Sequence, residues 1–248
     1  MLTYFQYRLL KKFAPHPPTS GDVYADRSKV LTMLGADFYS HVAGKLVIDF
    51  GCGYGDEAVE MAQRGPIRVI GIDLRESVLE QARKKALAAG VQDTCSFVTA
   101  TTELADVVVS LDAFEHFEDP AAILRMMNTL LKPGGTVHVS FGPTWYHPLG
   151  GHLFSVFPWA HLLFSEKALM RWRSDFKTDG ATHFGEVAGG LNQMTITYFE
   201  QLIAESPFQF SSFEPVPIRK LRCLHCRLTR EFTVAVVRCR LMKRPNKA

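Results

Sequence analysis

Three closely spaced glycines follow a short apolar run in the first quarter of the chain. The run is residues 45–50 (KLVIDF), and the glycines are Gly51, Gly53 and Gly55. Glycine lets the backbone turn sharply and approach a ligand closely, and the start of the helix expected next would present free N–H groups. Related turns occur in NAD and FAD proteins, so this spacing alone predicts only a nucleotide-type ligand.

Two aspartates narrow the chemistry of that ligand. Asp49 precedes the first glycine by two positions, where its carboxylate would face the amino group of a bound amino acid. Asp73 ends a second apolar run, residues 68–73 (RVIGID), where a carboxylate can accept hydrogen bonds from both hydroxyls of a ribose. Both acids would lie at the carboxyl ends of parallel strands, where open α/β sheets bind ligands. An amino-acid group and a ribose on one ligand favour S-adenosylmethionine (SAM).

Two further runs complete the pattern. Residues 106–110 (DVVVS) are followed by Glu115-His116, and residues 130–135 read LLKPGG. Together with the glycine turn, they resemble the class I SAM-dependent methyltransferases of the methyltransferase type 11-like group, over about residues 40–141. The resemblance implies an enzyme of the EC 2.1.1 type with SAM as its cofactor. The positions that it assigns to SAM are Asp49, Gly51, Cys52, Gly53, Gly55, Asp73, Leu74, Thr101 and Ser110.

The expected adenine contact departs from the family pattern. The family usually carries an acid just after its third strand, with a longer loop before the fourth. Here residues 99–104 (TATTEL) run almost directly into Asp106, and no clear acid occupies that place. Thr101 or a backbone carbonyl is expected to bind the adenine amino group instead.

Three polar side chains follow the predicted fourth strand, where an acceptor must lie. Asp112, Glu115 and His116 would share one face of a helical turn. They resemble the Glu-x-x-Glu-His ligands of metal-dependent O-methyltransferases, including the ubiquinone-pathway and small-RNA 2′-O-methylating groups. Those enzymes often add a histidine from just past the fifth strand, and this chain offers His147 and His152 there. The resemblance implies Mg²⁺ or another divalent metal, which would orient an acceptor hydroxyl and lower its pKa.

A second interpretation of these residues needs no metal. Glu-His is frequent at this place in related methyltransferases without one, and Asp112 is shorter than the glutamate of the pattern. Glu115 and His116 would then pair with each other, or His116 would act as general base. Both are catalytic candidates under either interpretation. Catalysis could otherwise rest mostly on positioning, because a sulfonium is already a reactive methyl donor.

Strands alternate with helices through the first 140 residues, which predicts an α/β fold with a parallel sheet and helices on both faces. Helices are expected at residues 56–63 and 76–89 and after Asp119-Pro120. Two later strands, at about 215–227 and 231–241, would form an antiparallel hairpin. The predicted fold is a Rossmann-like, seven-stranded, mostly parallel sheet with an antiparallel last strand. Its parallel strands are expected at residues 45–50, 68–73, 94–100, 106–110 and 136–141.

No linker or internal repeat divides the chain, so residues 1–248 are expected to form a single class I methyltransferase domain. Residues 1–40 would be an N-terminal lid, and residues 142–195 an insertion that builds the acceptor pocket. The aromatic side chains of the insertion would line that pocket or form a small core of their own. They are Trp145, Tyr146, Phe154, Phe157, Trp159, Phe164 and Trp172.

The composition is that of a globular protein with a core. The 248 residues are 47% hydrophobic and carry a net charge of +3, below the clustered basic excess of a dedicated nucleic-acid binder. Five cysteines and no secretory pattern favour reduced thiols and a cytoplasmic protein. Cys223, Cys226 and Cys239 are interpreted as strand cysteines, since a structural zinc site needs four ligands. Residues 141–165 lack Asp, Glu, Lys and Arg, but prolines and glycines interrupt them, so no transmembrane segment is expected and peripheral membrane contact stays open.

Three functions compete on these residues. The leading hypothesis is a methyltransferase for a small molecule, acting on a hydroxyl of an aromatic, quinone-like or lipid-linked compound. The second is an RNA methyltransferase, which the uncharged stretch beside the expected pocket argues against. The third is a catalytically silent SAM-fold regulatory protein, which the intact Asp49 and Asp73 argue against. The acceptor and the oligomeric state are not predicted by these residues.

Overall fold

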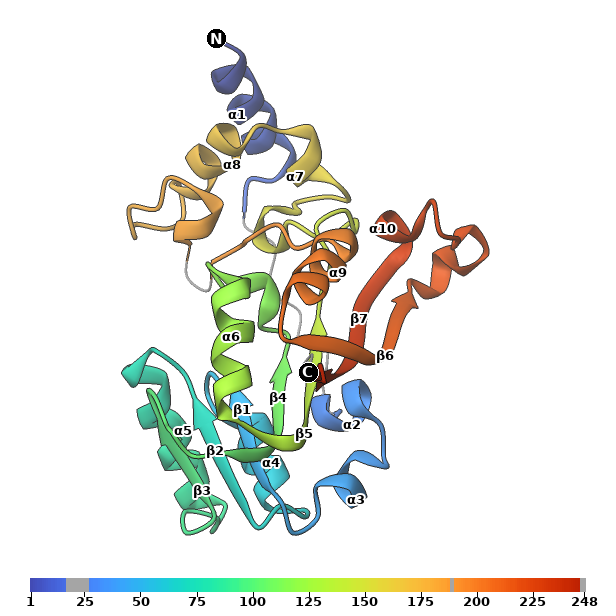
Figure 1. Ribbon diagram of the computed structural model, residues 1–248. Helices are drawn as coiled ribbons and strands as arrows, with labels where there is room; N and C mark the ends of the chain where they lie inside the picture. Colours follow the sequence, from blue (N-terminus) through green and yellow to red (C-terminus); the bar gives the residue numbers. More distant parts are fainter. Residues whose placement is uncertain (17–26, 188–189, 246–248) are drawn as a thin grey trace.

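The centre of the computed structural model is one seven-stranded sheet, and the structure describes residues 1–16, 27–187 and 190–245 (Figure 1). The strand order is β3-β2-β1-β4-β5-β7-β6. Strands β1 to β5 pair in parallel, whereas β7 is antiparallel to both β5 and β6. The predicted Rossmann-like fold is therefore confirmed. The strands are β1 Leu46–Phe50, β2 Arg68–Ile72, β3 Cys95–Val98, β4 Ala105–Leu111, β5 Leu131–Phe141, β6 Phe208–Pro217 and β7 Val234–Lys243.

The helices that connect the parallel strands lie close to their predicted positions. The Asp119 side chain accepts a hydrogen bond from the Ala122 backbone N–H at 2.9 Å and caps α6. Gly90, with φ of +69°, follows the end of α5. The helical segments are α1 Leu2–Phe13, α2 Lys29–Leu34, α3 Phe38–Val42, α4 Asp56–Ala62, α5 Glu76–Ala88, α6 Pro120–Leu130, α7 Ala160–Leu163, α8 Glu166–Arg173, α9 Ile196–Glu205 and α10 Arg230–Thr233, with 3₁₀ turns η1 Phe114–His116, η2 His152–Phe154, η3 Phe184–Glu186 and η4 Arg219–Leu224.

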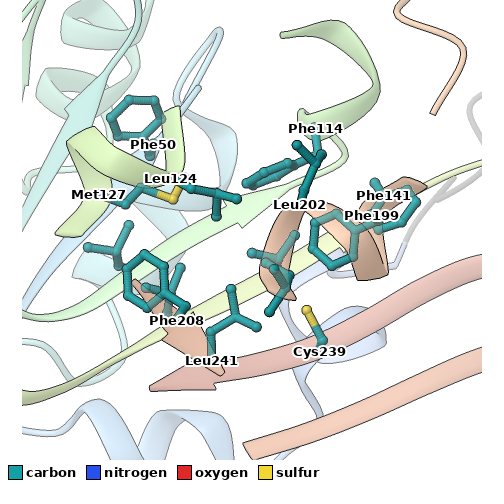
Figure 2. Close-up of a cluster of buried hydrophobic side chains, with 14 of the residues drawn as sticks. Phe50, Phe114, Leu124, Met127, Phe141, Phe199, Leu202, Phe208, Cys239 and Leu241 are labelled. Atoms are coloured by element: carbon teal, nitrogen blue, oxygen red, sulfur yellow. The ribbon is translucent and has the colours of Figure 1, made fainter. Parts of the chain in front are cut away.

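Alternate side chains of the strands build a separate core on each face of the sheet. Ile48 and Val108 face the layer formed by α6 and α9, where aromatic and aliphatic side chains interlock (Figure 2). Val47 and Val107 face the opposite layer, formed by α2 to α5. This division follows from the two-residue period of a strand. Cover on both faces is what a parallel sheet requires.

Two strand predictions need correction. The fifth strand begins at Leu131 rather than residue 136, because Leu131 already pairs with Ala105 of β4 and the Pro-Gly-Gly segment bulges out before Thr136 resumes the pairing. The expected hairpin strands at 215–227 and 231–241 are wrong in their bounds. The last strands are β6 and β7, and residues 218–233 form a connection with two short helical segments, η4 and α10, that projects beyond the sheet (Figure 1).

That correction moves two cysteines off the sheet. Cys223 and Cys226 are exposed in the connection, whereas Cys239 is buried on β7. All three are free thiols. Among the described residues they join no group of metal-ligating side chains.

A third, smaller core lies beyond the end of the sheet toward which β4 points (Figure 1). In it, α1 packs against α8, and the Trp172 indole N–H donates a hydrogen bond to the Ala14 carbonyl at 2.8 Å. Phe154 and Trp172 are fully buried, so at least these two aromatic residues of the insertion form a core. Within the described ranges, no helix combines the length and apolarity needed to cross a bilayer.

Candidate active site

The glycine turn after β1 is held against the end of β2. The backbone N–H groups of Gly51 and Cys52 donate to the Ile72 carbonyl at 2.8 and 3.0 Å. Gly55 has a φ of +76°, and a Cβ atom there would lie 2.6 Å from the Phe97 ring. Both its conformation and its surroundings therefore require glycine. The Cys52 side chain is buried in the α2–α5 core, and burial raises the pKa of its thiol, so this residue offers its main chain to a ligand.

Asp73 links this turn to β2. Its carboxylate accepts a hydrogen bond from the Gly53 backbone N–H at 3.1 Å. The Arg75 guanidinium donates to both carboxylate oxygens, from Nε at 3.0 Å and from a terminal nitrogen at 3.1 Å. Burial would raise the pKa of Asp73, but the hydrogen bonds from Arg75 and Gly53 outweigh it and lower the pKa. An ionised carboxylate therefore lies at the predicted ribose position, and the Arg75 side chain occupies both of its oxygens.

Asp49 is a buried acid with an unused oxygen. It is only 3% exposed, and its Oδ2 has no hydrogen-bond partner among the described residues. Burial raises its pKa to about 8, and repulsion from Glu57 adds to the effect while Lys29 opposes it. An unsatisfied buried carboxyl group is costly unless a ligand supplies its partner. The site therefore suits a cationic group such as an ammonium.

The remaining predicted cofactor residues differ in accessibility. Leu74 follows Asp73 and is 88% exposed. Thr101 follows β3, and its hydroxyl accepts a hydrogen bond from the Glu103 backbone N–H at 3.2 Å. Glu103 itself is held by both terminal nitrogens of Arg68. Ser110 lies on β4, fully buried, so its assignment to SAM stays a prediction that needs an opening of the site.

Past β4, three of the five predicted metal ligands come together. One ligand atom each of Glu115, His116 and His152 lies within 4.8 Å of the other two. Glu115 is 2% exposed; its Oε1 accepts from the Gly142 backbone N–H at 3.0 Å, and its Oε2 has no partner among the described residues. Burial, and then repulsion from Asp112, raise the pKa of Glu115 to about 8.

Hydrogen bonds fix the tautomer of the two imidazoles. His116 Nδ1 lies 2.9 Å from the Gly190 carbonyl, and His152 Nδ1 lies 3.2 Å from the Gly150 carbonyl. A carbonyl only accepts, so each Nδ1 donates and each Nε2 of the neutral ring keeps its lone pair. Burial, and then repulsion from His116, lower the pKa of His152 to about 4, which keeps it neutral. Metal-binding histidines commonly have this arrangement.

The other two predicted ligands lie outside the group. Asp112 does not share a helical face with His116, because its φ of +50° turns the chain before η1 begins. Its carboxylate accepts from the Ser140 hydroxyl at 3.1 Å. His147 uses Nδ1 to accept from the Leu149 backbone N–H at 2.9 Å. Of the two histidines expected beyond the fifth strand, the structure brings only His152 to Glu115 and His116.

Asn192 positions this turn and was missed from the sequence. Its side-chain amide donates to the carbonyls of Phe114 and Phe117 at 2.6 and 2.8 Å, and its backbone N–H donates to the Glu115 carbonyl at 2.9 Å. These bonds clamp the turn that carries Glu115 and His116. No local pattern marks Asn192, because its partners lie more than 70 positions earlier.

Comparisons with known proteins agree with this geometry. Residues 48–139 match the family model of a methyltransferase domain. The ubiquinone biosynthesis O-methyltransferase of Stutzerimonas stutzeri (strain A1501) is 43% identical over 110 residues, which are 42% of this chain and 47% of that protein. The chain thus spans about half the length of the curated relatives it matches.

Solved structures resemble nearly the whole chain. The magnesium protoporphyrin IX methyltransferase of Synechocystis PCC 6803 has a TM-score of 0.56 at 17% identity, covering 97% of this chain and 94% of that one. The [4+2]-cyclase SpnF has a TM-score of 0.59 at 14% identity, covering 98% and 95%. At these identities the likeness shows a shared fold and leaves the reaction open. The chain therefore has the fold of these proteins and, over residues 48–139, matches a methyltransferase domain.

Proposed function

We propose that this chain transfers a methyl group from SAM to a hydroxyl of a small aromatic, quinone-like or lipid-linked molecule. The proposal rests on the glycine turn, which is hydrogen-bonded to the end of β2, and on Asp49 beside it. The Oδ2 atom of this buried carboxyl group has no hydrogen-bond partner among the described residues, so it suits the ammonium of an amino acid. When bound, SAM supplies an electrophilic methyl group on its sulfonium. The chain then has to bind, orient and take up one proton. The ubiquinone O-methyltransferase relatives support an oxygen acceptor.

The residues at and just after the carboxyl ends of β1 to β3 would bind the separate parts of SAM. The main chain of Gly51 and Gly53 would lie along its methionine part, and ionised Asp49 would accept hydrogen bonds from the ammonium. Asp73 would accept both ribose hydroxyls once the Arg75 side chain moves aside. Leu74 offers exposed apolar surface to the adenine, and Thr101 a hydroxyl at the end of β3.

On the acceptor side, the histidine tautomers decide the chemistry. The Nε2 lone pair of His116 can bind a metal ion or, where no metal is bound, accept the proton of an acceptor hydroxyl, but it cannot do both at once. We propose that Glu115, His116 and His152 hold a divalent ion, because the buried Glu115 Oε2 has no other partner in the part of the chain that the structure describes. Two imidazoles and one carboxylate suit Mn²⁺, Fe²⁺ or Zn²⁺ better than Mg²⁺. Such an ion would orient the hydroxyl and lower its pKa.

The segments outside the sheet would shape the acceptor pocket. Residues 142–195 contribute His152 to the ligand group. They also contribute Asn192, which holds the turn that carries Glu115 and His116. Both contributions support their role as the acceptor insertion. Residues 1–40 would form the lid, of which α1 packs on α8 of the insertion.

Calorimetry with S-adenosylhomocysteine (SAH) tests the cofactor site. We expect Asp49→Asn and Asp73→Asn to weaken binding by at least about tenfold, since each removes a charge-assisted hydrogen bond. Asp93→Asn is the matched control, because Asp93 is an exposed acid in the turn before β3. Unchanged binding in both site variants, or tighter binding of NAD than of SAH, would refute the proposed function.

A further inference from the structure

Helix α1 carries two apolar faces, and the described residues cover only one of them. The covered face packs on α8: Leu10 is fully buried, and the Tyr7 hydroxyl bonds the Asp175 carboxylate at 3.0 Å. On the other face, Leu2, Phe5 and Phe13 are 69%, 59% and 67% exposed. With the half-buried Leu9 they follow one another at intervals of three, four and four residues, which places them in one stripe along the helix.

A basic rim runs beside this stripe. Arg8 and Lys12 are exposed and have no acidic partner among the described residues, while Lys11 pairs with Asp175 at 3.2 Å. Residues 1–16 contain no acid at all. A groove of about 790 Å³ lies between these cations, the aromatic rings of α1 and Arg171 of α8. An apolar stripe flanked by cations complements a surface that is anionic outside and apolar beneath.

The stripe also lies on the acceptor side of the molecule. Helix α1 stands at the end toward which β4 points (Figure 1). The core beneath it contains Phe154, the last residue of the turn that begins with His152. A surface contacted by α1 would therefore face the part of the chain that holds the proposed acceptor pocket.

We propose that α1 docks this protein onto an anionic phospholipid surface. The helix lies in the plane of the interface, with Leu2, Phe5 and Phe13 among the upper acyl chains and Arg8 and Lys12 at the headgroups. At 12 residues, it is too short to span a bilayer. This inference rests on the proposed function in one respect: a lipid-linked or quinone-like acceptor would reach the site from the same surface.

Sedimentation with vesicles tests the docking. We expect the full chain to bind vesicles of phosphatidylcholine with phosphatidylglycerol at least about tenfold more tightly than pure phosphatidylcholine, and less tightly as salt rises. Phe5→Ser/Phe13→Ser should weaken binding at least about tenfold. Arg8→Glu/Lys12→Glu, which changes only exposed side chains, should abolish the preference for anionic vesicles. Leu87→Ser is the matched control, because Leu87 is 66% exposed on the distant α5.

Three outcomes would overturn the docking. They are equal binding to both kinds of vesicle, wild-type binding by the charge-reversal variant, and a vesicle-free dimer that Phe5→Ser/Phe13→Ser dissociates, since a second copy would then cover the stripe. SAH calorimetry without vesicles separates the two proposals. A chain that binds SAH but no vesicles refutes only the docking, and one that binds vesicles but not SAH refutes only the proposed function.

Discussion

At the scale of single residues, the unusual feature is a buried acid that must be charged to bind its ligand. Because the pKa of Asp49 is raised to about 8, the group is largely protonated at pH 6.5 and an ammonium finds no anion there. We expect SAH affinity to rise by up to about tenfold per pH unit between pH 6.5 and 8 and then to level off. Titration calorimetry at several pH values checks this. The Asp49→Asn variant should bind SAH weakly and with an affinity that does not change over this pH range. If its SAH affinity rose with pH as in the wild type, another group would be responsible for the pH dependence.

Arg75 occupies the position that the cofactor ribose is expected to use. Its guanidinium must leave both Asp73 oxygens before two hydroxyls can bind there. Arg75→Ala should therefore tighten SAH binding about two- to tenfold, a modest gain because the Arg75 side chain is 55% exposed. Arg83→Ala removes an arginine of α5 that pairs with Glu76 and donates to the Phe97 carbonyl but does not contact Asp73, and it should leave SAH affinity unchanged. Weaker binding by Arg75→Ala would mean that the arginine contacts the cofactor itself.

His152 and His147 form a matched pair for testing the metal. Only His152 lies with Glu115 and His116, although the burial of both rings lowers both pKa values to about 4. We expect His152→Ala to reduce Mn²⁺ affinity about tenfold to a hundredfold and His147→Ala to leave it unchanged. Electron paramagnetic resonance of free Mn²⁺ measures this without any acceptor. Equal affinities in wild type and His152→Ala would leave His116 as a general base without a metal.

At the scale of elements, the glycine turn combines a strained conformation with a crowded position. Gly55 and Gly90 have similar positive φ values, +76° and +69°, but a Cβ atom meets Phe97 and Ala82 only at Gly55. Gly90→Ala should cost about 1–2 kcal/mol for the left-handed conformation alone. Gly55→Ala should cost a further 1–3 kcal/mol or so from overpacking. Urea unfolding of the two variants measures the difference. Equal losses of unfolding free energy would show that the side chains around Phe97 can rearrange to accommodate the added methyl group.

The elements that the sequence predicts well are those with local signals. Apart from the start of β5, apolar runs, the Asp119 cap and the glycines located the parallel strands and the helices α4 to α6 to within a few residues. The connection at residues 218–233 was wrongly predicted as strand, although Leu221, Leu224 and Leu228 recur at intervals of three and four, a helical spacing that agrees with η4 and α10. Asn192 and the Arg75–Asp73 contact were missed because they depend on packing, for which one sequence has no local signature.

At the scale of the whole molecule, the same buried groups connect the site to stability. Asp49 and Glu115 have folded pKa values of about 8, above their ordinary values of 3.8 and 4.5. The folded state therefore holds protons that the unfolded state releases. Their contribution is fully present below pH 4 and is lost as pH rises through about 8. Burial lowers the pKa of His138 to about 3 and of His152 to about 4, which has the opposite effect, but only below about pH 6.5.

The free energy of unfolding should thus fall between pH 6.5 and 8.5 in the ligand-free chain. Urea titrations at these pH values measure the fall, and the Asp49→Asn/Glu115→Gln double variant should remove most of it, since neutral side chains of the same shape bring no charge into the core. SAH with Mn²⁺ should also flatten the slope in the wild type, because ligands that bind only the folded state stabilise it and prefer the ionised acids. A slope that survives the double variant would come from other groups, such as the buried thiols of Cys52 and Cys239, whose pKa values burial also raises.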